Sequence, residues 1–231
     1  MSATFRGHDG GVDTSGDGVV NVVLYLVALA LFVQLAVRML QLGPTARRFP
    51  VVALAATIAI GVPSLLQLVW PAIGEALRRD PAATLDHAQW WRVLTSIAAQ
   101  DGGLIASVFN LVVVAVVVTL GEWLWGRWRV LVLFLLPSIL LNLLAIAWDA
   151  PGGGSSFASD GLLASVCALG LMVSTRMIVR VCALAVMAIG IVLVLLNDAH
   201  GVALLVGAAL GLAFAIRVRA RRPARSIRPT D

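Results

Sequence analysis

The feature that most constrains this chain is a series of apolar runs without any charged side chain. They lie at 19–37, 51–73, 103–121, 130–148, 161–175, 181–197 and 199–216. Most of them reach the ~20 residues that an α-helix needs to cross a hydrocarbon core of ~30 Å. A soluble fold could not bury the surface of a chain that is 60% hydrophobic and 13% charged. The sequence therefore predicts an all-α polytopic membrane protein with seven membrane helices.

The basic residues are divided unequally between the two ends of these runs. All 17 are arginines, and with a cytoplasmic C-terminus only Arg6, Arg78, Arg79 and Arg92 lie outside. Arginine and lysine collect on the cytoplasmic side of membrane proteins, and tryptophan collects at both interfaces. All seven tryptophans stand at the ends of runs, which predicts an aromatic belt. We therefore expect a multi-pass protein of the cell membrane, with its N-terminus outside and its C-terminus cytoplasmic.

The runs also divide the chain into segments. The first run is too long for the apolar part of a signal peptide and follows aspartates instead of basic residues. We therefore predict a polar, disordered tail over 1–18, an additional membrane helix over 19–40, a six-helix core over 51–216 and a basic cytoplasmic tail over 217–231. The two cysteines lie inside apolar runs, and no nucleic-acid module is visible. Neither a disulfide framework nor a metal site is predicted.

One run is short. At 1.5 Å per residue, 161–175 reaches only ~22 Å. A stretch rich in glycine and serine, 149–160, precedes it. This combination predicts that the loop dips into the outer leaflet, where irregular backbone is tolerated only if protein buries it or water reaches it. The alternative is a short helix that thins the bilayer, or that lets Arg176 and Arg180 extend to the interface.

The predicted topology places three polar side chains in the outer half of the membrane. They are Ser159, His200 and Asn110, from three different runs. A histidine can remove the proton of a serine hydroxyl, and an asparagine amide can donate to an oxyanion. Each residue also has a structural interpretation. Ser159 could cap a helix N-terminus, and His200 and Asn110 could form interhelical hydrogen bonds.

These residues, with their neighbours, resemble the rhomboid family of intramembrane serine proteases. The resemblance covers about 51–216. It rests on Trp90–Ser96, which contains Trp91 and Arg92, on Asn110 followed by Gly121-Glu122, and on Asn197–His200 followed by Ala203, Gly207 and Gly211. It implies a six-helix core with an additional helix before it, and a serine–histidine dyad that uses no cofactor. It also implies that Asn110 helps to bind the oxyanion.

The nucleophile departs from the family pattern, which is Gly-x-Ser-Gly followed by small residues. Ser159 as nucleophile places Gly161 and Ala164 at small positions, but puts Phe157 and Asp160 where the glycines should stand. Ser155 has better residues before it, but puts the same two bulky residues into the packed helix. We favour Ser159 and keep Ser155 as the alternative.

The function implied by the resemblance is cleavage of transmembrane protein substrates within the lipid bilayer. Three departures favour a second hypothesis, a catalytically inactive rhomboid-like protein that binds transmembrane helices. Ala106 stands where the family usually has an oxyanion-binding histidine, and Phe157 and Asp160 flank the expected nucleophile. A transporter is disfavoured, because no internal repeat and no charge deep inside a run is present.

Overall fold

The computed structural model describes residues 16–41 and 48–220, and these residues are mostly helical. Within them, the only strand-like pairing is an isolated bridge between Arg79 and Gly152. This confirms the predicted all-α class. The helices of the described residues are α1 (Gly16–Leu40), α2 (Val51–Leu66), α3 (Pro71–Leu77), α4 (Pro81–Asp86), α5 (Arg92–Thr95), α6 (Gly103–Trp125), α7 (Arg127–Ala147), α8 (Ser156–Val173), α9 (Met177–Leu195) and α10 (Ala199–Ala220).

Six helices in the described part of the chain are long and apolar enough to cross a membrane. They are α1, α6, α7, α8, α9 and α10. α2 is also apolar but has only 16 residues. The multi-pass architecture is confirmed, with α1 as the additional helix. The predicted tails lie outside the described residues over 1–15 and 221–231, and α10 continues through the first residues of the predicted C-terminal tail.

The predicted helix over 51–73 is shorter in the structure. α2 ends at Leu66, a turn follows, and Pro71 opens the separate helix α3. The residue before a proline is disfavoured in the α conformation, and Trp70 has φ −123° and ψ 86°. Gln67 at the end of α2 instead binds the backbone of Gln100, with Nε2 donating to its carbonyl at 2.8 Å. The chain therefore leaves the helix early.

The predicted short helix over 161–175 is longer in the structure. α8 begins at Ser156 and has 18 residues, a length of about 27 Å. The polar residues between Ser156 and Asp160 form its first turn, where backbone N–H groups have no partner within the helix. Their polarity makes them look like loop in the sequence, and this is why the predicted helix starts too late.

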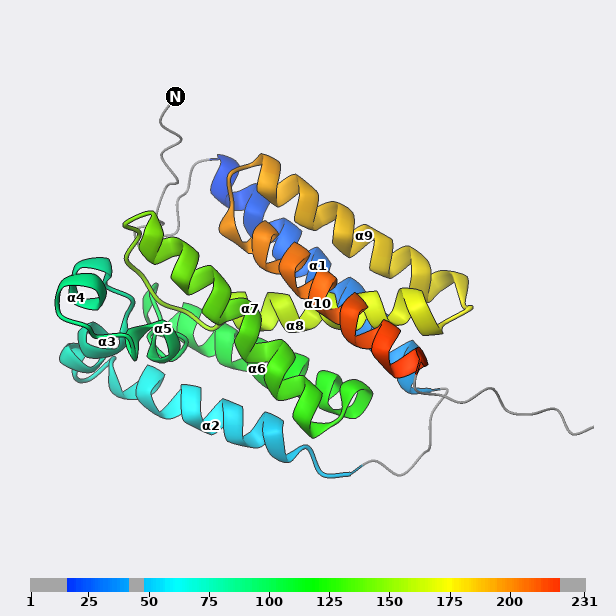
Figure 1. Cartoon of the computed structure of the whole chain (residues 1–231), viewed down its shortest axis with the longest axis horizontal. Helices are drawn as coiled ribbons and strands as arrows, with labels where there is room; N and C mark the ends of the chain where they lie inside the picture. The colour runs from blue at the N-terminus through cyan, green and yellow to red at the C-terminus, as the bar shows by residue number, and fades with distance from the viewer. Residues whose placement is uncertain (1–15, 42–47, 221–231) are drawn as a thin grey trace, which may run out of the picture.

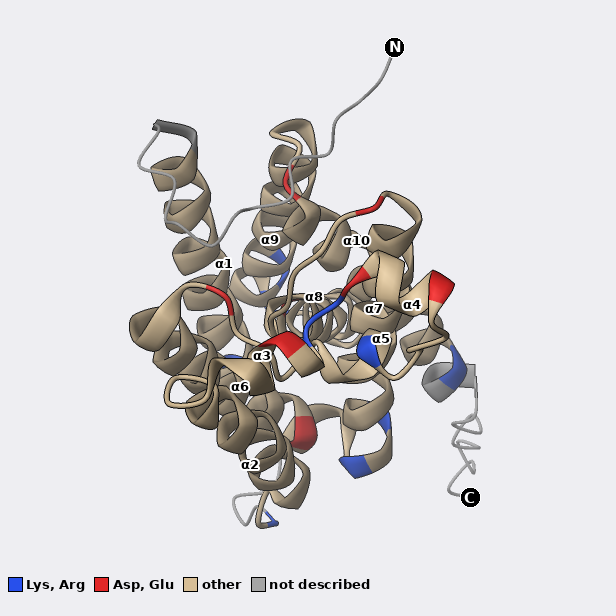
Figure 2. Ribbon diagram, turned by 90° about the vertical axis from the view of Figure 1, so that its left-hand side faces the viewer, with Lys and Arg blue, Asp and Glu red and all other residues tan. Residues whose placement is uncertain are grey.

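α8 is the central element of the bundle. It packs against α1, α6, α7, α9 and α10, and most of its residues are buried. Figure 2 shows it nearly end-on among the other helices. In Figure 1, the short helices α3, α4 and α5 lie together at one end of the bundle. α8 is therefore surrounded by other helices along most of its length.

The closest packing is between α8 and α10. A Cβ atom added at Gly207 would lie 2.0 Å from the carbonyl oxygen of Gly161, and one at Gly211 would lie 2.5 Å from Cα of Ser165. Contacts this short exclude any side chain larger than hydrogen at both glycines. The spacing of four residues keeps both glycines on one face of α10. The two backbones therefore touch along this face.

The carboxylate of Glu122, on α6, caps the N-terminus of α2. Its Oε2 accepts hydrogen bonds from the backbone N–H groups of Val52 and Ala53, at 2.8 and 3.0 Å. Arg127 lies 3.4 Å from its other oxygen. α2 has no side-chain cap of its own, so Glu122 supplies the negative charge that a helix N-terminus favours.

The tryptophan side chains differ in exposure. Trp70, Trp90, Trp91, Trp128 and Trp148 are exposed, as a belt requires. Trp125 is instead buried, where its Nε1 donates to Ser165 Oγ at 3.2 Å and its ring packs edge-on against Phe214. Most tryptophans therefore have the exposure that the predicted belt requires, whereas protein covers the ring of Trp125.

The glycine contact predicts a large effect of one methyl group. Gly207→Ala should lower the free energy of unfolding by about 3 kcal/mol, because the methyl would overlap the backbone of α8. Ala209→Val, which adds volume on the exposed face of the same helix, is the matched control and should change little. Thermal unfolding in detergent measures both. Equal stability of the two variants would contradict the contact.

Candidate active site

A serine and a histidine meet where α8 and α10 begin. His200 is the second residue of α10, and its Nε2 lies 2.9 Å from Oγ of Ser156, the first residue of α8. The His200 side chain is 25% exposed, so the protein does not cover it completely. This is the geometry of a hydroxyl poised to give its proton to an imidazole.

The imidazole is oriented by an aspartate two residues before it. Oδ1 of Asp198 lies 2.7 Å from Nδ1 of His200 and also accepts the backbone N–H of His200 at 2.9 Å. A carboxylate only accepts, so Nδ1 carries the proton. Nε2 is then the basic nitrogen, and it faces Ser156. The three side chains form a serine–histidine–aspartate arrangement.

The second oxygen of Asp198 is bound by α1. The hydroxyl of Tyr25 donates to Oδ2, and so does Nδ2 of Asn21 at 2.8 Å. Burial alone would raise the pKa of Asp198, but the hydrogen bonds and charge of His200, with the hydrogen bond of Tyr25, lower it to about 2. Asp198 is therefore ionised at neutral pH.

Two aromatic rings enclose the imidazole. The rings of Tyr25 and Phe157 lie with centroids 4.9 and 5.2 Å from that of His200, both tilted. Phe157 departs from the expected glycine, and its ring is used here to pack against the histidine. The imidazole is thus held by a carboxylate at one nitrogen and by rings on its faces.

The two serines singled out from the sequence lie elsewhere. Oγ of Ser159 is buried and has no hydrogen-bond partner among the described residues. Oγ of Ser155 is also buried and accepts a hydrogen bond from Nε2 of Gln100 at 3.2 Å. The serine hydroxyl that the structure brings to His200 is that of Ser156, which the sequence analysis did not consider. The assignment of Ser159 as nucleophile therefore has no contact with His200 to support it.

A signal for Ser156 is present in the sequence. Gly154-Ser155-Ser156-Phe157 matches the Gly-x-Ser-Gly pattern at its first and third positions and departs only at the last. Gly154 has φ +146°, a region that side chains rarely adopt, so a glycine is required there. Reading the pattern from Gly154 would have identified Ser156.

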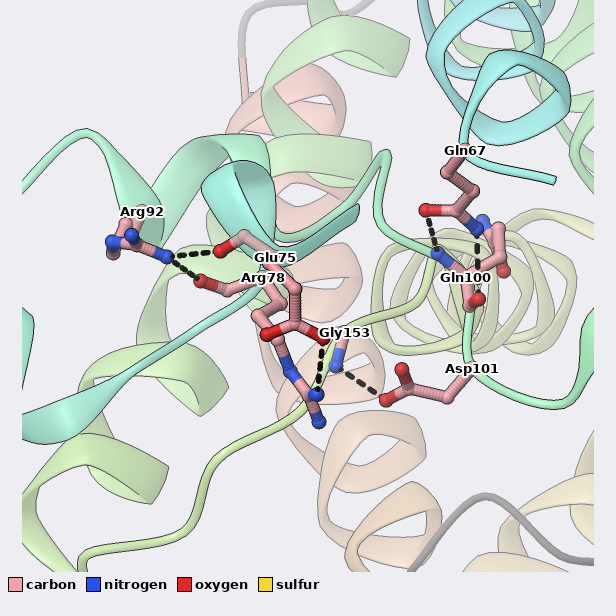
Figure 3. Close-up of polar contacts among 7 residues, drawn as sticks. All are labelled: Gln67, Glu75, Arg78, Arg92, Gln100, Asp101 and Gly153. Carbon is pink, nitrogen blue, oxygen red and sulfur yellow. Dashed lines mark hydrogen bonds and ion pairs between the residues drawn. The ribbon is translucent and has the colours of Figure 1, made fainter. Parts of the chain in front are cut away.

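Asn110 contacts the site through Gln100. Its Nδ2 donates to Oε1 of Gln100 at 2.7 Å, and Gln100 in turn donates to Ser155, the neighbour of Ser156. Gln100 is buried, and its backbone is held by Gln67 (Figure 3). Asn110 is therefore connected to the start of α8 through Gln100, and it lies on the side of the bundle where the predicted topology puts it.

The loop before α8 is fixed by charged side chains from preceding segments. The buried Arg79 donates to the carbonyls of Ala150 and Pro151, at 2.7 and 3.2 Å. The carboxylate of Asp101 accepts the N–H of Gly153 at 2.9 Å, as Figure 3 shows. The irregular backbone of this loop is thus satisfied by protein groups, which meets the condition stated for a loop at membrane depth.

The tryptophan–arginine motif organises the short helices. Nη1 of Arg92 donates to the carbonyls of Glu75 and Arg78, both at 2.8 Å (Figure 3). Trp91 is exposed, and its backbone carbonyl accepts the N–H groups of Leu94 and Thr95 in α5. Arg92 therefore joins α3 to α5, and Trp91 faces the surroundings.

Fold and site together define a polytopic helical membrane protein with a serine–histidine site at the start of two packed helices. No three His, Cys, Asp or Glu residues in the described ranges are grouped to hold a metal ion. The model of the Rhomboid domain matches residues 87–221, more than half of the chain. The chain belongs to the rhomboid family, which confirms the resemblance. No curated protein matches it.

The contacts of Arg79 predict how the site loop can be loosened. Arg79→Met should lower the free energy of unfolding by about 2–4 kcal/mol, because the carbonyls it binds lose a charged donor. Limited proteolysis should then cut within 149–155 faster than in the wild type. Arg78→Met is the control, because its side chain pairs with the exposed Glu75 instead. Unchanged protection in Arg79→Met would contradict this role.

Proposed function

We propose that this protein is an intramembrane serine protease in which Ser156 is the nucleophile and His200 the general base. The observation that carries the proposal is the 2.9 Å contact between Oγ of Ser156 and Nε2 of His200. Membership of the rhomboid family, whose members are generally intramembrane serine proteases, supports the same chemistry. The dyad keeps His200 as expected from the sequence and moves the nucleophile from Ser159 to Ser156.

The proposed reaction has two halves, acylation and deacylation, and His200 relays a proton in each. Oγ of Ser156 attacks a peptide carbonyl while its proton passes to Nε2 of His200. The tetrahedral intermediate collapses to an acyl-enzyme as His200 returns this proton to the leaving amine. A water molecule, deprotonated by His200, then releases the acyl group and restores the hydroxyl of Ser156.

The oxyanion would form next to the N-terminus of α8. Ser156 is the first residue of this helix, and the first backbone N–H groups of a helix have no partner within it. These N–H groups and the helix dipole favour negative charge there. Asn110 is proposed as a further donor, released from Gln100 when substrate is bound. Backbone donors of this kind would offset the missing histidine at Ala106.

The proposed substrates are transmembrane proteins, and lipids surround the helices. The apolar surfaces of α2, α6 and α9 carry many exposed large hydrophobic side chains, which suits contact with lipid chains. The arginine distribution supports an N-terminus outside and a cytoplasmic C-terminus. With this orientation, the beginnings of α8 and α10, and therefore the site, lie toward the outer side.

The alternative is an inactive rhomboid-like protein that binds transmembrane helices. The packing of Phe157 against His200 favours it, because a ring in place of a glycine narrows the space beside the dyad. Asp160, one helical turn after Ser156, adds a second acidic group near the position of the oxyanion. Both features oppose catalysis, and activity measurements distinguish the two functions.

The dyad predicts a specific order of effects among the serines. With a purified substrate whose transmembrane helix unwinds easily, Ser156→Ala and His200→Ala should each abolish cleavage. Ser159→Ala and Ser155→Ala, the matched controls one turn and one residue away, should retain most of it. Asn110→Ala should lower kcat by ~10²-fold, as expected for one oxyanion donor. Cleavage that depends on Ser159 but survives Ser156→Ala would overturn the assignment, and no cleavage by wild type would favour the inactive alternative.

The orientation predicts one-sided labelling of the site. A membrane-impermeant fluorophosphonate should label Ser156 in intact cells, because the site would open outward. The same reagent should not label Ser156 in sealed inside-out vesicles until detergent is added. The Ser156→Ala variant controls for labelling elsewhere. Labelling in the opposite pattern would reverse the proposed topology.

A further inference from the structure

The additional helix α1 reaches the proposed active site. Residues 16–40 lie outside the matched Rhomboid domain, yet Asn21 and Tyr25 contact Asp198 at the start of α10. Tyr25 also lies with its hydroxyl 3.1 Å from Nδ1 of His200. α1 packs along α9 and touches α6 and α8, so these polar contacts belong to a continuous interface. The same helix therefore supplies two polar side chains to the site.

A simpler role for Asp198 is to cap α10. Its Oδ1 accepts the backbone N–H of His200, and aspartate is a preferred residue at this position. A cap uses one carboxylate oxygen and needs no contact with an imidazole. Here Oδ1 also binds Nδ1 of His200, and Oδ2 is bound by two side chains from a different helix. The contacts exceed what a cap requires.

The geometry of these contacts fixes the carboxylate in one orientation. Asn197 has φ +59°, a left-handed turn that ends the connection from α9 and brings Asp198 beside the imidazole. Asn21 and Tyr25 then hold Oδ2, which leaves Oδ1 directed at Nδ1. The Asp198 side chain is 12% exposed, so water competes weakly for these bonds.

We propose that Asp198, fixed by Asn21 and Tyr25 of α1, is a positioning residue that holds His200 in the tautomer needed to accept the proton of Ser156. This inference rests on the proposed function. It makes the site a triad of Ser156 on α8, His200 on α10 and Asp198 in the α9–α10 connection, with Asp198 held by α1. α1 is then part of the active site in this protein, in addition to its role as a membrane helix.

The test separates positioning from capping. Asparagine caps a helix as well as aspartate does, so Asp198→Asn keeps an acceptor for the backbone N–H of His200 and should lower the melting temperature less than Asp198→Ala, which has no cap. Without the carboxylate charge, kcat should fall by ~10²–10⁴-fold while KM stays unchanged, because only the orientation and charge stabilisation of the imidazole are lost. The rate of fluorophosphonate labelling of Ser156 should fall in parallel.

The role of α1 is tested by a double-mutant cycle. Tyr25→Phe keeps the ring against His200 and removes only the hydroxyl, so kcat should fall about tenfold, the loss of one hydrogen bond to a charged group. In the Asp198→Asn background the same change should have little further effect, because Tyr25 acts through the carboxylate. Gln34→Leu, at an exposed polar residue of the same helix, is the control and should leave kcat unchanged.

The outcomes distinguish this inference from the proposed function. Cleavage and Ser156 labelling by wild type, with unchanged kcat in Asp198→Asn, would overturn the triad and leave the protease intact. A loss of kcat in Asp198→Ala, which removes the cap together with the charge, that is absent in Asp198→Asn would also overturn it, in favour of a cap. A Tyr25→Phe effect that persists undiminished in the Asp198→Asn background would show that Tyr25 does not act through Asp198, and this would overturn the role proposed for α1. A wild type that neither cleaves nor becomes labelled would overturn the proposed function itself.

Discussion

The close contact between α8 and α10 is the constraint on which the site depends. Two helices that carry ordinary side chains lie 8–10 Å apart, and only small residues allow a closer approach. Gly161 and Gly207 remove the side chains at the crossing. The first turns of both helices are thereby brought together, and Ser156 and His200 can share a hydrogen bond. The contact between Ser156 and His200 therefore depends on the close packing of α8 against α10.

The lengths and composition of the apolar runs predicted most of the architecture, because the bilayer imposes strong rules on both. The membrane helices and the additional α1 followed from these rules and from the family pattern. The limits of α2 and α8 did not follow. Pro71 and the side chain of Gln67 end α2 early, and polar residues begin α8. Neither effect is visible in the length of an apolar run.

The contacts of the proposed site were predicted in part. His200 and Asn110 were singled out because they are isolated polar residues at a shared depth. Ser156 was missed because the small residues after Ser159 suggested a different register, although the pattern that begins at Gly154 points to Ser156. Tyr25 and Asn21 gave no signal, because a single sequence does not reveal which polar groups on one helix face another helix.

The cap that Glu122 provides for α2 has a consequence for the order of synthesis. The capped N–H groups of α2 belong to Val52 and Ala53, and the carboxylate that binds them comes 70 and 69 residues later. When the ribosome has completed α2, its N-terminal hydrogen bonds must still be made to water or lipid headgroups. The N-terminus of α2 can therefore form its native hydrogen bonds only after α6 has emerged. Although α2 is synthesised first, it reaches its final hydrogen bonding no earlier than α6 does.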